Sequence, residues 1–182
     1  PTPIIGLSAF VGNNPLTIDA GDVDGDGLDD LLVVNSSDNT VSVLLTQEDF
    51  EGDLSFSSFT LSVPGSNQSI TCGAIIDWDG DADLDAVVGV DRSDPEDSDT
   101  YQVLLDLSNS PSVGSVFDTS DEPSAVDGGE SIGSSWGFVG GTQGGHIHRA
   151  TQAIGVLQLI GDIGQNNIVT IEAKDLDDDG GD

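Results

Sequence analysis

The hydrophobic residues of this chain alternate with polar ones over short stretches, which is typical of β-strands that bury one face. The stretch ITCGAII (70–76) shows this alternation directly before an acidic segment. Continuous apolar runs occur at 31–34 (LLVV) and 86–90 (AVVGV), as expected for strands covered on both faces. No segment shows a convincing helical stripe, and the best candidate, 149–162, is weakened by Gly155. The pattern predicts an all-β fold.

A nine-residue acidic pattern precedes both apolar runs, with aspartates at positions one, three, five and nine. The two complete copies are DVDGDGLDD (22–30) and DWDGDADLD (77–85). A third copy, DLDDDGGD (175–182), reaches only its eighth position in this sequence. A neighbouring subunit could supply the missing oxygens, and truncation of the sequence explains the same feature. Recurrence of one pattern at this spacing indicates an array of similar units.

Each unit reads as four antiparallel strands, because a polar turn and two further strand candidates follow the apolar run. The second and third acidic copies begin 98 residues apart, against 55 for the first two, so a degenerate unit without acids is expected between them. We interpret the chain as a single repeat domain. Its units lie at about 10–64, 65–118, 119–165 (degenerate) and 166–182 (the start of a further unit).

The acidic pattern suits a hard cation. Ca²⁺ takes six to eight oxygen ligands at about 2.3–2.6 Å, and a tightly curled loop brings alternate side chains to one point. Glycines at positions four and six (Gly25, Gly27 and Gly80) allow the backbone a positive φ, whereas Ala82 replaces the sixth-position glycine of the second loop. The predicted ligands are Asp22, Asp24, Asp26, the Leu28 carbonyl and Asp30; Asp77, Asp79, Asp81, the Asp83 carbonyl and Asp85; and Asp175, Asp177, Asp179 and the Gly181 carbonyl.

An EF-hand is excluded, because it requires an acidic residue at position twelve and helices on both sides. Position twelve is Val33 in the first loop and Val88 in the second, both within predicted strands.

These residues resemble a known family. The stretch PLTIDAGDVDGDGLDDLLVVNSSDNTVSVLLTQ (15–47) is similar to an FG-GAP/VCBS repeat, the unit of integrin-type β-propellers and of many secreted bacterial proteins. The resemblance covers about residues 10–117 and, in part, the C-terminal loop. It implies four-stranded blades with Ca²⁺ between the first two strands, but no single activity. Because closed propellers have four to eight blades, the chain is expected to form an incomplete propeller or a repeat array.

Charge narrows the choice of partners. Lys and Arg total 3 against 34 Asp and Glu, giving a formal net charge of −31. Nucleic acid and anionic membrane both attract cationic surface, so neither is expected as a partner.

The single cysteine, Cys72, cannot form an internal disulfide and is expected in the core. No stretch is long and apolar enough to cross a bilayer.

Other candidate sites are less well defined. His146 and His148 would share a face of a strand, where they could bind Zn²⁺ or Cu²⁺ with a carboxylate as third ligand, or could simply be polar strand residues. Trp78, Trp136 and Tyr101 could stack on sugars. Nucleophilic catalysis lacks a convincing constellation of residues, and no lysine has a plausible catalytic setting.

The sequence therefore predicts an extracellular, calcium-binding, non-catalytic structural or adhesive module. Neighbouring copies or further repeats of the same protein are the expected partners, with glycans or a cell-surface protein as further possibilities. A sharper version makes the chain a subunit of a surface fibre. The alternative is an accessory or carbohydrate-binding domain of a secreted polysaccharide-degrading enzyme.

Overall fold

The computed structural model describes residues 8–65, 67–81, 83–93, 97–108, 111–131, 135–152, 155–164 and 166–172, with only the backbone of 129–131 and 135–136. This part of the chain contains strands and no helix, and hence no helix able to span a membrane. The all-β prediction is confirmed. The strands are β1 (Pro15–Gly21), β2 (Asp30–Asn35), β3 (Thr40–Glu48), β4 (Leu54–Ser62), β5 (Gln68–Ile76), β6 (Asp85–Arg92), β7 (Asp99–Leu105), β8 (Ser112–Thr119), β9 (Pro123–Ser131), β10 (Ser135–Thr142), β11 (His146–Thr151) and β12 (Gln158–Asp162).

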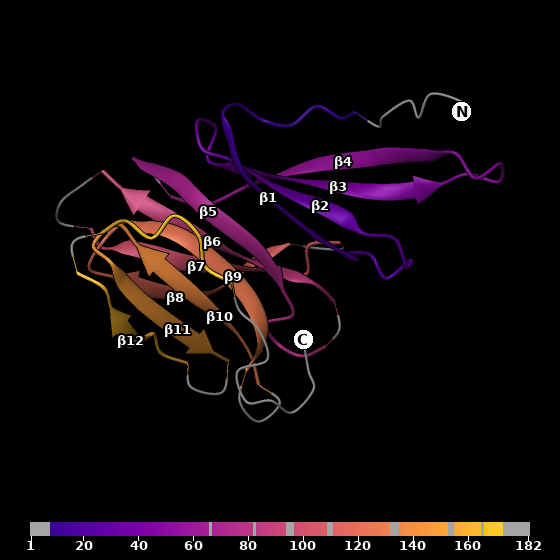
Figure 1. Ribbon diagram of the computed structural model, residues 1–182. Coiled ribbons are helices and arrows are strands. Elements are labelled where there is room, and N and C mark those ends of the chain that lie inside the picture. The colour runs from indigo at the N-terminus through magenta and orange to yellow at the C-terminus, as the bar shows by residue number, and fades with distance from the viewer. Residues whose placement is uncertain are drawn as a thin grey trace.

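The strands form three four-stranded antiparallel sheets, each joining its strands in chain order (Figure 1). Sheet 1 contains β1 to β4, sheet 2 contains β5 to β8, and sheet 3 contains β9 to β12. The predicted four antiparallel strands per unit are confirmed. Sheet 3 lies within the segment interpreted as a degenerate unit, 119–165, and the weak helical candidate at 149–162 contains the end of β11 and all of β12.

Two apolar cores join the sheets. The first contains Leu32, Val34 and Val43 of sheet 1 together with Val88 and Val90 of sheet 2, all of them buried. The second joins sheets 2 and 3 and is rich in aromatic residues. Its rings belong to Trp78, Tyr101, Phe117 and Phe138. Each sheet therefore buries a face against its neighbour, as the blades of a propeller do.

Glycines permit two of these close approaches. A Cβ atom added to Gly73 of β5 would lie 2.6 Å from Val34 Cγ2, at the junction of sheets 1 and 2. At the junction of sheets 2 and 3, a Cβ atom on Gly140 would lie 2.4 Å from Tyr101 Cζ. The Tyr101 ring cannot move away easily, because its hydroxyl donates to the Gly141 carbonyl at 2.8 Å. The close approach of neighbouring sheets thus requires glycine, which has no Cβ atom, at both positions.

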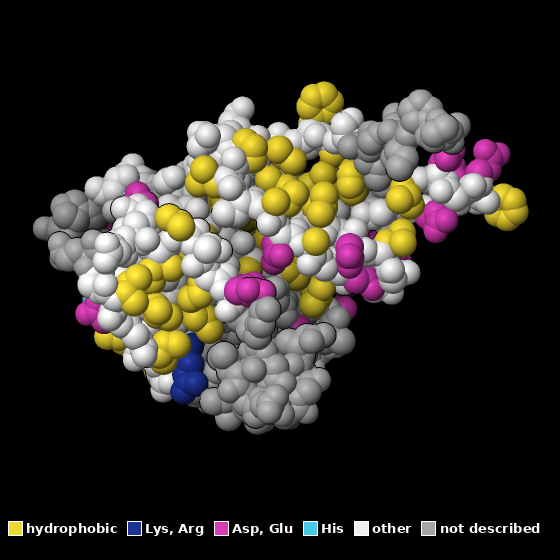
Figure 2. Space-filling view, viewed as in Figure 1, with side chains coloured by type: hydrophobic (Ala, Val, Ile, Leu, Met, Phe, Trp, Pro, Cys, Tyr) yellow, Lys and Arg dark blue, Asp and Glu magenta, His cyan; other side chains and the backbone are white. Residues whose placement is uncertain are grey.

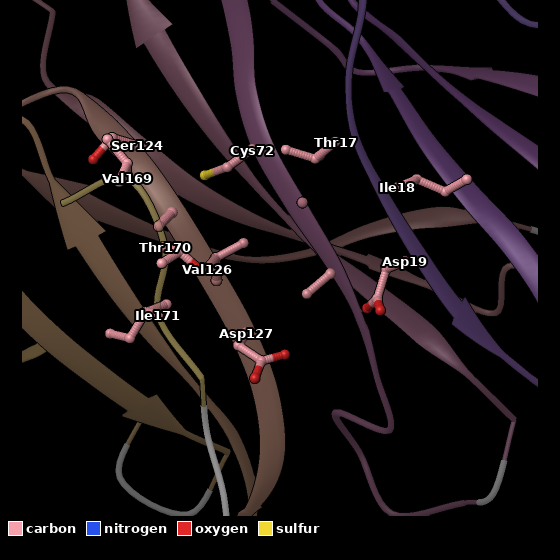
Figure 3. A pocket seen from close by; sticks show the side chains of 13 residues that line it. Thr17, Ile18, Asp19, Cys72, Ser124, Val126, Asp127, Val169, Thr170 and Ile171 are labelled. Carbon is pink, nitrogen blue, oxygen red and sulfur yellow. The ribbon is translucent and has the colours of Figure 1, made fainter.

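The first strands of the three sheets surround a common cavity of about 240 Å³ (Figure 3). It is lined by residues 17–19 of β1, 72–74 of β5, 124–127 of β9 and 169–171 near the C-terminus. The last segment is held against sheet 3, where Ser124 donates to the Ile168 carbonyl at 2.6 Å. Propellers arrange their blades around a central channel in the same way.

Candidate metal-binding loops

Both complete acidic loops connect the first two strands of a sheet. In sheet 1 the last ladder pair is Gly21 with Asp30, which leaves residues 22–29 as the connection. In sheet 2 the corresponding pair is Ile76 with Asp85, and residues 77–84 form the connection. The resemblance implied this position for the loops, and the structure places them there.

Glycines turn the loops as predicted. Gly25, Gly27 and Gly80 have φ values of 75°, 90° and 77°, a region that favours glycine because it lacks a Cβ atom. The curled backbone then points amide groups inward. Gly27 N–H donates to Asp22 Oδ2 at 2.9 Å, and Gly80 N–H donates to Asp77 Oδ1 at 2.7 Å. Position one of each loop is fixed by its own glycines. Ala82 lies outside the described residues.

Three of the predicted side chains converge in each loop, those at positions one, three and nine. In each set, one carboxylate oxygen per residue lies within 4.8 Å of those of the other two. Oxygens bound to one Ca²⁺ at about 2.3–2.6 Å are at most about 5 Å apart, so this spacing fits the ion. The two sets are Asp22, Asp24 and Asp30, and Asp77, Asp79 and Asp85.

An unsatisfied oxygen in the first loop supports the same interpretation. Asp22 Oδ1 is buried and has no hydrogen-bond partner among the described residues. A buried carboxylate oxygen without a partner is costly, and a bound cation would satisfy it.

Position five does not join either set. In the first loop, Asp26 Oδ1 instead accepts the Leu28 N–H at 2.9 Å. In the second loop, Asp81 lies in a separate group with the carboxylates of Asp83 and Asp106. Sequence reasoning assigned only a carbonyl role to Asp83 and missed Asp106 entirely, because Asp106 follows β7, far from the loop along the chain.

Position nine has a second role. The fully buried Asp30 carboxylate accepts the Val23 N–H at 2.8 Å through Oδ2 and the Thr46 N–H at 2.7 Å through Oδ1. Asp85 repeats the arrangement with Trp78 N–H and Asp106 N–H, both at 2.8 Å. The Asp30 carboxylate therefore connects the first loop to β3, and the Asp85 carboxylate connects the second loop to Asp106, the residue directly after β7. We call this arrangement the position-nine tether.

Burial, and then the charge of neighbouring carboxylates, raises the pKa of three of these carboxyl groups. Burial raises the pKa of Asp85 to about 6, although its two amide donors oppose the change. Burial likewise raises the pKa of Asp30. The pKa of Asp79 is raised first by desolvation and then by the negative charge of Asp81. A divalent cation among these oxygens would favour their ionised forms and reverse this tendency.

Sheet 3 has no acidic loop that corresponds to those of sheets 1 and 2. In sheet 3 the corresponding ladder pair is Ser131 with Ser135, so only residues 132–134 connect β9 to β10. This unit has lost most of the loop as well as its acids. The third acidic copy, with Asp175, Asp177, Asp179 and Gly181, lies outside the described residues.

Two of the three aromatic candidates for sugar stacking lie in the core. Trp78 is 4% exposed and packs edge-on against Phe117, with ring centroids 5.6 Å apart, and Tyr101 is fully buried. Neither presents a ring face to solvent. The side chain of Trp136 is not among those described.

Fold and loops together define a repeat protein of propeller-like blades, with an acidic loop between the first two strands of sheets 1 and 2. The family model for the FG-GAP-like repeat matches residues 22–88, which include both loops. The resemblance drawn from the sequence is confirmed over this stretch.

A search of curated proteins found no match. Among solved structures, the chain is similar to one described as "Crystal structure of BBS1N in complex with ARL6DN, soaked with lead". The TM-score is 0.46 at 12% identity, and the alignment covers 90% of this chain. The chain spans 59% of the length of that chain. A likeness of this degree carries no argument about function.

Proposed function

We propose that this chain is a calcium-binding, non-catalytic structural or adhesive module of an extracellular protein. The observation that carries the proposal is the convergence of three carboxylates in each of two loops of the same register. All these donors are oxygens, which Ca²⁺ and other hard cations prefer. The buried, unpartnered Asp22 Oδ1 adds a group that the ion would satisfy.

The environment outside cells suits such sites. Extracellular modules bind Ca²⁺ with dissociation constants of about 10⁻⁴–10⁻³ M, and calcium there is plentiful enough to fill them. The net charge of −31 would also be partly offset by bound cations. In this role Ca²⁺ holds the loop between the first two strands and fixes the geometry of the sheet.

Calorimetric melting of the chain in Ca²⁺ and in EDTA tests the proposal. At a calcium concentration of about 100 times the dissociation constant, each occupied site adds about 2.7 kcal/mol to the free energy of unfolding. We expect a higher Tm in Ca²⁺, and a much smaller difference in the double variant Asp24→Asn, Asp79→Asn. Asp118→Asn, an exposed residue of β8 outside both loops, is the control. An equal Tm in Ca²⁺ and EDTA for the wild type would refute the proposal.

Assembly is the second part of the proposal. Apolar side chains are exposed on β1 (Leu16 and Ile18) and on β12 (Leu159 and Ile160). Figure 2 shows hydrophobic side chains gathered on this face of the molecule, over the regions of sheet 1 and of sheet 3. Exposed apolar areas of this kind mark surfaces that other protein covers, here further repeats or neighbouring copies.

Sedimentation velocity over a range of concentrations tests association between copies. We expect larger species in the wild type and fewer in Ile18→Ser, with electron microscopy showing whether the larger species are fibres. A wild-type chain that stays monomeric at every concentration would contradict association between copies.

A further inference from the structure

The last strand of each sheet has one edge that pairs with no other described strand. These outer strands are β4 in sheet 1, β8 in sheet 2 and β12 in sheet 3. An unpaired edge presents backbone N–H and C=O groups that can pair with a strand of another molecule. Proteins prevent such pairing with short edge strands, charged side chains, proline and irregular register.

Two of the three outer strands carry this kind of protection. Strand β8 contains Asp118, and its register with β7 is irregular between Gln102 and Leu104. Strand β12 has five residues, ends at Asp162 and pairs irregularly with β11. Both edges are therefore poor places for pairing with another molecule.

Strand β4 has none of these protective features. Its nine residues pair with β3 in one continuous register from Leu54 to Ser62. The strand contains no proline, and residues 54–76 contain no charged residue, although 20% of the chain is charged. Six of the nine side chains of β4 are exposed. The hairpin of β3 and β4 also projects beyond the other two sheets (Figure 1).

We infer that two copies of this chain pair through their β4 strands, antiparallel and about a twofold axis at Ser58. Such a contact is self-complementary, because each copy contributes the same unprotected edge and both edges are satisfied at once. In this register Phe56 lies opposite Thr60 of the second copy, and Leu54 lies opposite Ser62. Each exposed apolar side chain thus faces a small hydroxyl-bearing one, and no charged side chain enters the ladder.

The charge at the hairpin tip selects the antiparallel direction. Residues 48–53, at the tip, contain four acidic side chains, and Figure 2 shows acidic side chains gathered there. Parallel pairing would place the two tips side by side. In the antiparallel arrangement the two Asp53 residues are ten positions apart, roughly 34 Å, whereas exposed charges are screened over about 8 Å at physiological ionic strength.

The overall charge also favours this edge as the contact. Each copy carries a formal net charge of −31, so two copies repel each other over most of their surface. A stretch of 23 residues without charge, 54–76, begins with β4 and lowers the cost of contact there. The inference deepens the assembly part of the proposed function, and rests on it for the expectation that copies associate.

Sedimentation velocity of the full chain carrying Ile18→Ser, which reduces contacts through β1, tests the pairing. We expect dimers, and Ser58→Lys should raise their dissociation constant at least about tenfold, because two like charges then meet at the axis. The added lysine changes the net charge from −31 to −30, so weaker association cannot result from stronger overall repulsion. Gln152→Lys makes the same change of charge at an exposed turn of sheet 3 and should leave the dimer intact.

Cysteine crosslinking tests the register. Residues directly opposite each other in antiparallel strands have Cβ atoms about 4.5–5.5 Å apart, near the separation that a disulfide needs. Ser58→Cys should therefore form a linked dimer under mild oxidation. Ser55→Cys, exposed on the same strand, lies six positions or roughly 20 Å from its copy and should not. The native Cys72 is buried and does not interfere.

Two results would overturn the inference: equal dimer dissociation constants for Ser58→Lys and Gln152→Lys, or equal crosslinking of Ser55→Cys and Ser58→Cys. Copies that still associate would then use another surface, and the assembly part of the proposed function would stand. A wild-type chain that is monomeric at every concentration would contradict both. Ser58 is exposed, so Ser58→Lys keeps the fold, which a thermal melt verifies.

Discussion

The position-nine tether predicts a specific effect of Asp30→Asn. The substitution preserves the size of the side chain but leaves a single acceptor oxygen where the structure uses two. One of the two amide donors, Val23 N–H or Thr46 N–H, then faces the NH₂ group of the new side chain. Because the site is fully buried, water cannot take over as the acceptor.

The magnitude follows from these contacts. A hydrogen bond to a charged group contributes about 1.5–3 kcal/mol, and a buried amide left unpaired costs about 1–3 kcal/mol. These effects overlap, and because burial raises the pKa of Asp30, removal of its buried charge offsets part of them. We therefore expect Asp30→Asn to lower the free energy of unfolding by about 1–3 kcal/mol. For a chain of this size each kcal/mol changes Tm by about 2–4 °C, so the expected fall is about 2–12 °C.

The matched comparison is Asp24→Asn, a residue of the same loop and the same carboxylate group. Its side chain is exposed, and among the described residues its oxygen accepts just the Asp26 N–H, at 3.3 Å. In EDTA this variant should melt within about 0.5 kcal/mol of the wild type, or slightly higher because one repelling charge is removed. In Ca²⁺ both variants should lose the stabilisation of the first loop by metal.

Urea denaturation in EDTA, followed by circular dichroism, measures the difference between the two variants without any contribution from metal. The reasoning predicts that Asp30→Asn is clearly less stable than Asp24→Asn under these conditions. Equal midpoints for the two variants would refute it, since position nine would then act only through the cation.

Three further predictions concern the rest of the fold. Gly140→Ala should cost about 1–3 kcal/mol in urea denaturation, because its Cβ would meet Tyr101, whereas Gly161→Ala, with its nearest contact at 3.4 Å, should cost less than 1 kcal/mol. The pKa of Asp85 is raised to about 6, so the folded state favours the protonated side chain and ionisation of Asp85 opposes folding. In EDTA the contribution of protonated Asp85 to the free energy of unfolding is complete below about pH 4. It is lost as the pH rises through about 6, a change on the order of 3 kcal/mol. The free energy of unfolding should therefore fall over this range more steeply in the wild type than in Asp85→Asn, and parallel profiles would contradict this. Cys72 is buried, which raises its thiol pKa to about 12, so it should react with a thiol reagent only at the rate of unfolding, and fast labelling of the folded protein would contradict the core assignment.

The sequence was informative wherever the physical cause is local. Alternation and apolar runs predicted the strands, and the repeated acidic pattern predicted loops between the first and second strands of two sheets. Glycine at Gly25, Gly27 and Gly80 predicted the positive φ values, because that backbone conformation penalises a Cβ atom. Each of these features is determined within about ten residues of the chain.

Features that depend on tertiary register were not predictable. Thr46 and Asp106 meet position nine only because the second and third strands pair in a particular register. Position five stays a prediction. Asp26 Oδ1 accepts the Leu28 N–H, a short-range hydrogen bond that the acidic pattern alone did not indicate.

Comparison of the three sheets shows where a bound cation would act. Sheet 3 joins its first two strands through three residues without the acidic loop, yet it has the same strand order as sheets 1 and 2. The acidic loop is therefore not required to form a four-stranded sheet, and its crowded carboxylates oppose folding. On the proposed function, Ca²⁺ offsets that cost at the loop. Asp30 and Asp85 also accept hydrogen bonds from the backbone N–H groups of Thr46 and Asp106. An ion that fixes these carboxylates would therefore stabilise the contact of each loop with the third strand of its sheet, and through that contact the whole sheet.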